Sequence, residues 1–415
     1  MIKNTLTTLF FSALVSLPVY AGNVEVLHWW TSGGEAKSID VLKQMLREEG
    51  HDWNDFAIEG GGGESAMTVL ATRAISGNPP SAAQIKGHDI QEWANLGLLA
   101  NMNVVALQDD WDDVIPPVIA NIMKYHSEYV AVPFNIHRVN WLWANKAIFD
   151  QAGLTVPNTL DEFFVVAEKL KRLGYIPLAH GGQPFQDATV FESIALAILG
   201  SDDYRKAFVD LDMQVLQSDK MVEVFRQLKR IQGYIDIHSP GRDWNVATNM
   251  VIQGKAAMQV MGDWAKGEFT AAGKIPGQDY YCVPAFGTDN MFSYNIDSFV
   301  FFDLNNDEDI QAQRALASTI MSKPFQRLFN INKGSIPVRS DMDISDFDQC
   351  AQQSLQSFKQ AQSANTLVPS MAHGMSTTSY AQGAIYDVVS SFFNDPNADP
   401  ESAVHRLASA IKASI

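Results

Sequence analysis

Apolar and polar residues alternate from Val24 to Trp30, a pattern typical of a β-strand. A turn follows at Thr31–Gly34, after which apolar residues recur at helical spacing through Leu46. The same order repeats twice, with strands at 56–58 and 82–85, a glycine loop at 60–63, and helices at 65–76 and 89–94. Repeated strand–helix alternation predicts an α/β fold with a mainly parallel sheet flanked by helices.

A second set of elements begins near Tyr129–Phe134, where a strand pattern contains a proline. We interpret this segment as a crossover into a second lobe. Thr159 and Glu162 have the spacing of a capping box, which predicts a helix through Leu170. Further helices are predicted at 221–231 and 248–253, and strands at 256–260 and 298–302. The length of 415 residues is enough for two domains of ordinary size.

The first 21 residues have the pattern of a secretory signal peptide. A cation at Lys3 precedes an apolar stretch from Leu9 to Val19, and small residues end at Ala21. The stretch is too short and too interrupted to span a bilayer, and no later segment is long and apolar enough. We therefore expect export to the periplasm, cleavage after Ala21 and a soluble mature protein.

The formal net charge of −17 becomes −18 once Lys3 is removed. A net negative charge of this size repels nucleic acid and anionic membrane surfaces, so a neutral or cationic small ligand is the better candidate. The only two cysteines, Cys282 and Cys350, would meet an oxidising compartment after export, where a disulfide persists. Two buried free thiols are the alternative, because sequence separation does not reveal the Cα distance that a bridge requires.

Trp29 and Trp30 are the strongest functional signal in the pattern. They lie at the carboxyl end of a predicted strand, before a glycine turn and a helix start, where open α/β sheets place ligands. A tryptophan ring can pack against the C–H face of a pyranose and keep its N–H for a hydrogen bond. Core packing of both rings explains the pattern equally well, since tryptophan is usually buried.

Several other kinds of site are excluded or disfavoured. The glycines at 60–63 lack the Lys-Ser/Thr that completes a nucleotide loop. The nine histidines show no metal-ligand spacing, so we expect no metal site and no cofactor. The segment 303–307 resembles a calcium loop, but Glu308 and Arg314 replace its turn glycine and bidentate glutamate. No GxSxG nucleophile elbow is present.

Carboxylates near aromatic residues leave a secreted glycoside hydrolase as the alternative function. Glu35, Asp263 and Asp297 are the residues concerned. A glycosidase needs two carboxyl groups at a defined separation around one bond, which a sequence does not reveal. The same carboxylates serve equally well as acceptors that bridge neighbouring sugar hydroxyls.

Six segments together resemble the glucose-binding branch of the bacterial extracellular solute-binding proteins of the maltose-binding type. They are HWWTSGGE at 28–35, QIKG at 84–87, GDWAKGEF at 262–269, NIDSF at 295–299, KGSIP at 333–337 and HGM at 373–375. A further segment, GKAAM at 254–258, is common to the wider superfamily. The resemblance covers the whole length after the leader.

The resemblance implies a two-lobed periplasmic-binding-protein fold whose lobes are joined by hinge strands and close around one monosaccharide, with glucose favoured. Lobe one would comprise 22–134 and 298–340, and lobe two 135–297 and 341–415. The implied partner is an inner-membrane ABC importer, the protein would be a monomer and no enzyme, and a chemoreceptor is a further candidate partner.

The resemblance also implies the roles of nine residues. Trp29 and Trp30 would form the aromatic wall of lobe one, and Trp264 and His373 would contribute from lobe two. The remaining five would bond sugar hydroxyls, Glu35 as an acceptor, Lys86 and Lys333 as donors, and Asn295 and Asp297 from the hinge region. Which of the two neighbouring tryptophans stacks on the ligand stays open, because adjacent side chains of a strand point to opposite faces.

Overall fold

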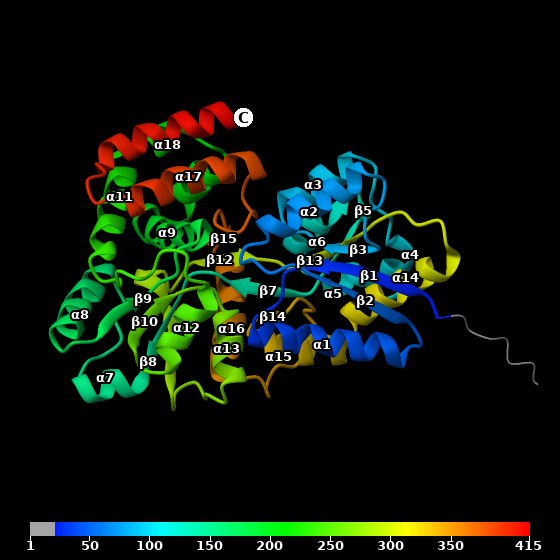
Figure 1. Cartoon of the computed structure of the whole chain (residues 1–415), viewed down its shortest axis with the longest axis horizontal. Helices are drawn as coiled ribbons and strands as arrows, with labels where there is room; N and C mark the ends of the chain where they lie inside the picture. Colours follow the sequence, from blue (N-terminus) through cyan, green and yellow to red (C-terminus); the bar gives the residue numbers. More distant parts are fainter. Residues whose placement is uncertain (1–20) are drawn as a thin grey trace, which may run out of the picture.

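The computed structural model describes residues 21–415 and shows two α/β bodies side by side with a small sheet between them (Figure 1). Lobe one is the body around the sheet of β1, and lobe two is the body around the sheet of β8. The two-lobed α/β fold expected from the sequence is therefore confirmed. Apart from Ala21, the predicted signal peptide lies outside the described residues. The residue boundaries assigned to the lobes stay a prediction.

The sheet of lobe one has the order β2-β1-β3-β13-β6. Its strands are β1 (Asn23–His28), β2 (Asp52–Ala57), β3 (Ala82–Gln84), β13 (Ser298–Phe301) and β6 (Ala131–Pro133). The first three strands are parallel, as the strand–helix repeats predict. β13 arrives from the other lobe and runs antiparallel to both of its neighbours. β1 ends at His28, so Trp29 and Trp30 lie just beyond the strand.

The sheet of lobe two has the order β11-β8-β10-β9. Its strands are β8 (Trp141–Asn145), β9 (Ile176–Ala179), β10 (Ala256–Val260) and β11 (Tyr280–Pro284). The predicted mainly parallel arrangement is wrong for this sheet, because β8 is antiparallel to both β10 and β11. The chain enters β8 directly from a hinge strand rather than through a crossover helix, which is the connection that parallel pairing requires.

A third sheet of four short strands lies between the lobes, in the order β14-β7-β12-β15. They are β7 (Asn135–Arg138), β12 (Phe292–Asn295), β14 (Ile336–Pro337) and β15 (Leu367–Pro369). The strand expected across Tyr129–Phe134 is interrupted, with β5 (Glu128–Tyr129) pairing with β4 (Lys124–Tyr125) before β6 begins. The chain passes between the lobes through this central sheet.

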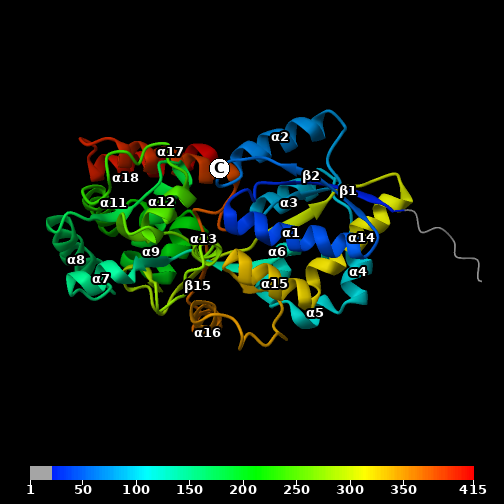
Figure 2. The same ribbon diagram turned by 60° about the horizontal axis from the view of Figure 1, so that its bottom comes forward.

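Helices cover the sheets on both sides (Figures 1 and 2). Around lobe one lie α1 (Gly33–Glu48), α2 (Glu64–Ile75), α3 (His88–Asn95), α4 (Asn103–Gln108), α5 (Trp111–Val114), α6 (Pro117–Met123), α14 (Asp307–Met321) and α15 (Lys323–Lys333). Around lobe two lie α7 (Lys146–Ala152), α8 (Leu160–Arg172), α9 (Pro184–Phe208), α10 (Met213–Leu216), α11 (Asp219–Gln232), α12 (Trp244–Ile252), α13 (Ala265–Ala271), α17 (Ser379–Asn394) and α18 (Pro400–Ser414). α16 (Gln349–Ser363) contacts the central sheet.

Local sequence signals account for several helix starts. The capping box predicted at Thr159 and Glu162 is present, and α8 follows it. Ser32 and Glu35 form a second capping box at the start of α1. The helix predicted from residue 248 is wrong at its start, because α12 begins four residues earlier at Trp244. That first turn places additional side chains near the lobe boundary.

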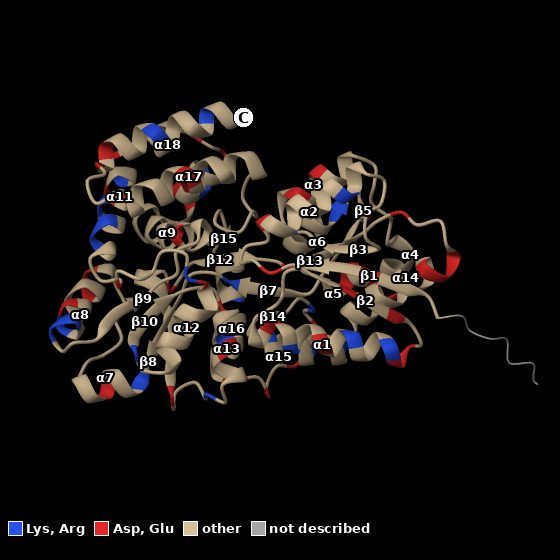
Figure 3. Ribbon diagram, viewed as in Figure 1, with Lys and Arg blue, Asp and Glu red and all other residues tan. Residues whose placement is uncertain are grey.

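Each lobe has its own apolar core. One buried cluster contains the β1 sheet together with Trp29 and Trp30, and two further clusters fill lobe two, one of which contains Trp264. No helix among residues 21–415 is long and apolar enough to cross a membrane. Acidic and basic residues are interspersed along the outer helices in this view (Figure 3).

The structure joins Cys282 of β11 to Cys350 of α16 in a disulfide, with their Cα atoms 6.1 Å apart. The alternative of two free thiols therefore does not apply. The bridge connects the sheet of lobe two to the helix that packs on the central sheet.

Candidate functional site

A cavity lies between the two lobes, next to the central sheet. All nine residues that the sequence nominates line it: Trp29, Trp30, Glu35, Lys86, Trp264, Asn295, Asp297, Lys333 and His373. They come from separate stretches of the chain and from both lobes, so the tertiary structure brings together what the sequence disperses.

Trp29 presents its ring to the cavity from lobe one. A Cβ atom on Gly63 would lie 3.0 Å from atoms of this ring, and Gly63 has the left-handed φ of 89° that favours glycine. The glycine loop before α2 therefore lets the backbone pack directly against the indole. The ammonium of Lys86 lies 5.5 Å from the centre of the same ring. Trp29 is thus held between a backbone turn and a cation at the cavity wall.

Trp30 is packed into lobe one, with only 2% of its surface exposed. Its ring contacts three phenylalanines at centroid distances of 5.1 Å (Phe134), 5.6 Å (Phe299) and 5.4 Å (Phe329). Lys333 lies over the ring at 5.3 Å. Both tryptophans line the cavity, and Trp30 is the more deeply buried of the two.

Trp264 comes from lobe two, immediately before α13. It makes edge-on contacts with His373 at 4.7 Å and with His137 at 5.2 Å between ring centres. A Cβ at Gly262 would lie 2.2 Å from the Trp264 ring, so this position requires glycine. The ring is fixed in place before any ligand enters.

A buried charge cluster lies at the base of the cavity. The ammonium of Lys333 donates to Oε1 of Glu35 at 2.7 Å and lies 4.0 Å from Oδ2 of Asp297. Glu35 also accepts a hydrogen bond from the Ser32 hydroxyl at 3.0 Å. Two carboxylates therefore share one ammonium, and both keep lone pairs for further donors.

His137 was missed by the sequence reasoning, yet it links two carboxylates of the site. Its Nδ1 pairs with Asp263, and its Nε2 lies 3.0 Å from Oδ2 of Asp297. Burial opposes protonation, but the two carboxylates outweigh it and raise the pKa of His137. Burial likewise acts to raise the pKa of Asp297, and His137 with Lys333 and Lys86 reverses this and holds it well below its ordinary value. Asp297 is therefore an anion.

Lys86 and Asn295 bring polar groups to the cavity without protein partners. Within residues 21–415 the ammonium of Lys86 makes no hydrogen bond or ion pair, and burial lowers its pKa. The Oδ1 atom of Asn295 is buried and has no hydrogen-bond partner. Because an unpaired buried polar group costs about 1–3 kcal/mol, the Oδ1 atom of Asn295 calls for a ligand group or water in the cavity, and the ammonium of Lys86 keeps its donors for one.

His373 lies on the lobe two side, after β15. Its Nε2 is 3.2 Å from the hydroxyl of Thr189 on α9. Burial lowers the pKa of His373 well below its ordinary value, and the positive charges of Lys86 and His137 add to this. His373 is therefore neutral and offers one donor and one acceptor nitrogen.

Several lining residues escaped the sequence reasoning. They are Thr31, Ser32, Glu59, the glycines 60–62, His137, Phe185, Asp243, Trp244 and Asn245. Asp243 and Trp244 were missed because the helix was expected to start later; an N-cap aspartate before an apolar face was the available signal. The glycine loop forms part of this cavity.

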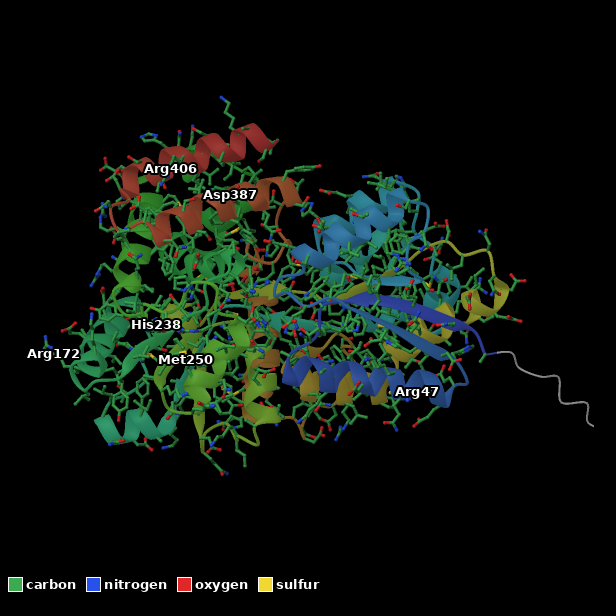
Figure 4. The ribbon with its side chains drawn as sticks, in the orientation of Figure 1. Arg47, Arg172, His238, Met250, Asp387 and Arg406 are labelled. Carbon is green, nitrogen blue, oxygen red and sulfur yellow. A yellow bond between two sulfur atoms is a disulfide. The ribbon has the colours of Figure 1, made fainter. Side chains whose placement is uncertain are left out.

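The lobes touch on several sides of the cavity. The amide of His88 donates to the carbonyl of Gly374 at 3.1 Å, and a Cβ at Gly61 would lie 2.8 Å from the Phe185 ring. α1 and α13 lie side by side at the lobe boundary (Figures 1 and 2). The labelled Arg47, Arg172 and Arg406 project outward, away from this boundary (Figure 4). The structure thus represents a form in which both lobes enclose the cavity.

Among residues 21–415, no group of three or more His, Cys, Asp or Glu side chains is arranged so that it could hold a metal ion. The cavity instead combines aromatic rings with charged and amide groups that hydrogen-bond.

Comparisons with known proteins agree with this architecture. A family model described as bacterial extracellular solute-binding protein matches residues 38–303. A probable sugar-binding periplasmic protein of Rhizobium meliloti is 46% identical, over 95% of this chain and 94% of its own. Among solved structures, a chitin oligosaccharide binding protein aligns with a TM-score of 0.81 and 17% identity, over 95% of this chain and 99% of its own. A maltose-bound T. maritima protein aligns with a TM-score of 0.78 and 14% identity, over 95% and 100%.

Proposed function

Because the chain belongs to the bacterial extracellular solute-binding proteins, we propose that it captures glucose in the interlobe cavity and delivers it to an inner-membrane ABC importer. As a member of this family it is a receptor for a solute and not an enzyme. The periplasmic sugar-binding name of its relative from Rhizobium meliloti supports both the location and the class of ligand.

The observation that carries the proposal is the buried, unpaired Oδ1 atom of Asn295, in a cavity that the ammonium of Lys86 and the ring of Trp29 also line. A sugar has many hydroxyls that each need a partner when buried, together with a C–H face that packs on an aromatic ring. An ammonium donor and an amide acceptor next to an indole meet these needs. An apolar ligand would leave both polar groups unpaired.

The charges of the cavity support a neutral ligand. Glu35 is paired with Lys333, and Asp297 is paired with His137. These four ions therefore pair within the protein, and their remaining lone pairs, like the ammonium of Lys86, can bond to the hydroxyls of a neutral ligand. The motifs shared with the glucose-binding branch support glucose among the neutral sugars.

Binding from both lobes supports hinge closure as the mode of capture. Trp29 and Glu35 belong to lobe one, whereas Trp264 and His373 belong to lobe two. Only the closed form brings all of them to one ligand, so the ligand shifts the equilibrium toward closure. The importer can then recognise the closed arrangement of the two lobes.

The glycosidase alternative finds no support in the carboxylates. A glycosidase needs one protonated carboxylic acid near neutral pH. The pKa of Asp297 is held well below its ordinary value, and Glu35 is committed to Lys333 and the Ser32 hydroxyl. The family assignment excludes this function on independent grounds.

Calorimetry with purified protein tests the proposal. Glucose should bind at a single site, and Trp264→Ala or Asp297→Ala should abolish measurable binding while a cooperative thermal melt remains. The matched control is Asp202→Ala, which removes an exposed carboxylate of lobe two and should leave affinity unchanged. A thermal-shift screen of monosaccharides and short oligosaccharides ranks the ligands, because only true ligands raise the melting temperature by mass action. Unchanged affinity in both site variants would overturn the site.

A further inference from the structure

Glu192 is a buried carboxylate on α9 that does not line the cavity. Its side chain is completely inaccessible to solvent. None of the ion pairs among residues 21–415 involves it, so no nearby cation compensates its charge. Burying an unpaired carboxylate opposes folding, because water solvates the anion far better than the protein interior does. Its hydrogen bonds therefore need an explanation.

Three donors surround the Glu192 carboxylate. The Ser293 hydroxyl donates to Oε1, and Oε2 accepts from the Ser370 hydroxyl at 2.8 Å and from the Ala372 amide at 2.7 Å. Burial raises the pKa of Glu192, and these hydrogen bonds act in the opposite direction. One side chain therefore binds two chain segments that lie about 80 residues apart in the sequence.

Both segments lead directly into the sugar site. Ser293 precedes Asn295 by two residues on β12, so the two side chains lie on the same face of that strand. Ala372 immediately precedes His373. The two segments are also hydrogen-bonded to each other, through the amide of Ser370 and the carbonyl of Tyr294 at 2.9 Å.

The same face of α9 also contacts His373 itself. Thr189 lies one helical turn before Glu192, and its hydroxyl is 3.2 Å from Nε2 of His373. Asn295 has an orphaned Oδ1, so no protein hydrogen bond at that atom orients the amide. The placement of Asn295 therefore depends on the backbone of β12, which Glu192 contacts through Ser293.

We propose that Glu192 is a positioning residue of the sugar site, whose single carboxylate holds the segments carrying Asn295 and His373 at the separation that the ligand requires. This inference rests on the proposed function of the cavity. It assigns a binding role to a residue that touches no ligand, and it explains why an uncompensated carboxylate is retained in the interior of lobe two.

Three substitutions test this role by calorimetry, well below the melting temperature. Glu192→Leu removes all three hydrogen bonds and leaves their buried donors unpaired, so it should weaken glucose binding at least about tenfold. Glu192→Gln keeps an acceptor oxygen and gains a donor for the Ser293 hydroxyl, so affinity should stay within about threefold. The matched control is Asp187→Asn, a buried acid of the same helix whose partners are His180, Ser390 and Asn394.

Asp187→Asn should lower the melting temperature while glucose affinity stays within about twofold, because its partners lie away from the site. A double substitution separates positioning from general destabilisation. If Glu192 acts through His373, then Glu192→Leu should cost much less affinity in a His373→Ala background than in the wild type. Additive effects would overturn the inference. If Glu192→Leu does not fold, Ser370→Ala removes one of the same bonds and should weaken binding about threefold.

The outcomes distinguish the two proposals. A wild type that binds no sugar overturns the proposed function. If the wild type and folded Glu192→Leu bind glucose with equal affinity, the positioning role alone is overturned. Where Glu192→Leu does not fold, the same comparison is made between the wild type and Ser370→Ala.

Discussion

The backbone amide of Gly34 donates a hydrogen bond to Oε1 of Glu268 at 2.8 Å, across the boundary between the lobes. Gly34 lies in the first turn of α1, where the helix presents unpaired amides and partial positive charge. Glu268 lies on α13, four residues after Trp264. A carboxylate of one lobe thus bonds to a helix start of the other beside the ligand cavity, which favours the closed form.

We expect Glu268→Ala to weaken glucose binding about five- to tenfold, because a charge-assisted hydrogen bond of the closed form is lost. The melting temperature without ligand should change little, since neither core is altered. Calorimetry gives the affinity, and small-angle scattering gives the fraction of closed protein at saturating ligand. Equal affinity in variant and wild type would show that this contact does not contribute to closure.

Gly34→Ala tests the same boundary by steric means. A Cβ at Gly34 would lie 2.6 Å from the carbonyl carbon of Gly267, too close for the lobes to keep their contact. We expect weaker binding with an unchanged melt of the ligand-free protein. The matched control is Gly383→Ala, because a Cβ there meets no atom within 4 Å.

Substitutions at Trp29 and Trp30 should affect different properties, ligand affinity at Trp29 and folding stability at Trp30. Trp30→Ala should lower the free energy of unfolding by about 3–5 kcal/mol, because the ring is packed among three phenylalanines. Trp29→Ala should have the larger effect on ligand, with affinity at least about 100-fold weaker, since its ring faces the cavity. Urea unfolding and calorimetry on both variants check this. The reverse ranking would mean that Trp30 forms the stacking wall.

Asp89 should make stability depend on pH. Burial raises the pKa of Asp89 from 3.8 to about 6, with Glu92 adding to the rise and Lys86 opposing it. The folded state therefore binds this proton more tightly than the unfolded chain, so the stabilisation is complete below about pH 4 and is lost as pH rises through about 6.

Asp89→Asn removes this dependence. The variant should melt within error of the wild type at pH 4 and about 2 °C or more above it at pH 7.5, measured by calorimetric scans. Asp40→Asn, an exposed carboxylate of the same lobe, serves as the control and should show no such divergence. A constant difference between Asp89→Asn and wild type at both pH values would contradict the assignment.

The Cys282–Cys350 disulfide should contribute stability without contributing to binding. The bridge joins cysteines that are 68 residues apart in the sequence. In the chain-entropy model, removing a disulfide that closes a loop of this size lowers the free energy of unfolding by roughly 4 kcal/mol. Substituting both cysteines by serine should lower the melting temperature, while glucose affinity at 25 °C stays within about twofold. Neither cysteine lines the cavity, so a large loss of affinity would be unexpected.

The sequence by itself determined many of the local elements and nominated part of the site. Alternation and glycine turns placed β1, α1 and β10 close to their observed bounds, and the capping box at Thr159 marked the start of α8. These signals are local, because hydrogen bonds and apolar faces within about ten residues produce them. Motif resemblance nominated nine residues that the fold brings to one cavity.

Only the tertiary structure decided which of those side chains have protein partners and which have polar groups left for a ligand. Trp29 and Trp30 are adjacent in the chain and both line the cavity, but distant phenylalanines pack around Trp30, whereas Lys86 and the glycine loop contact Trp29. The pairing of His137 with Asp297 and the lack of partners at Asn295 likewise depend on atoms from remote segments. Burial and hydrogen-bond satisfaction are properties of the assembled interior, so a linear pattern does not contain them.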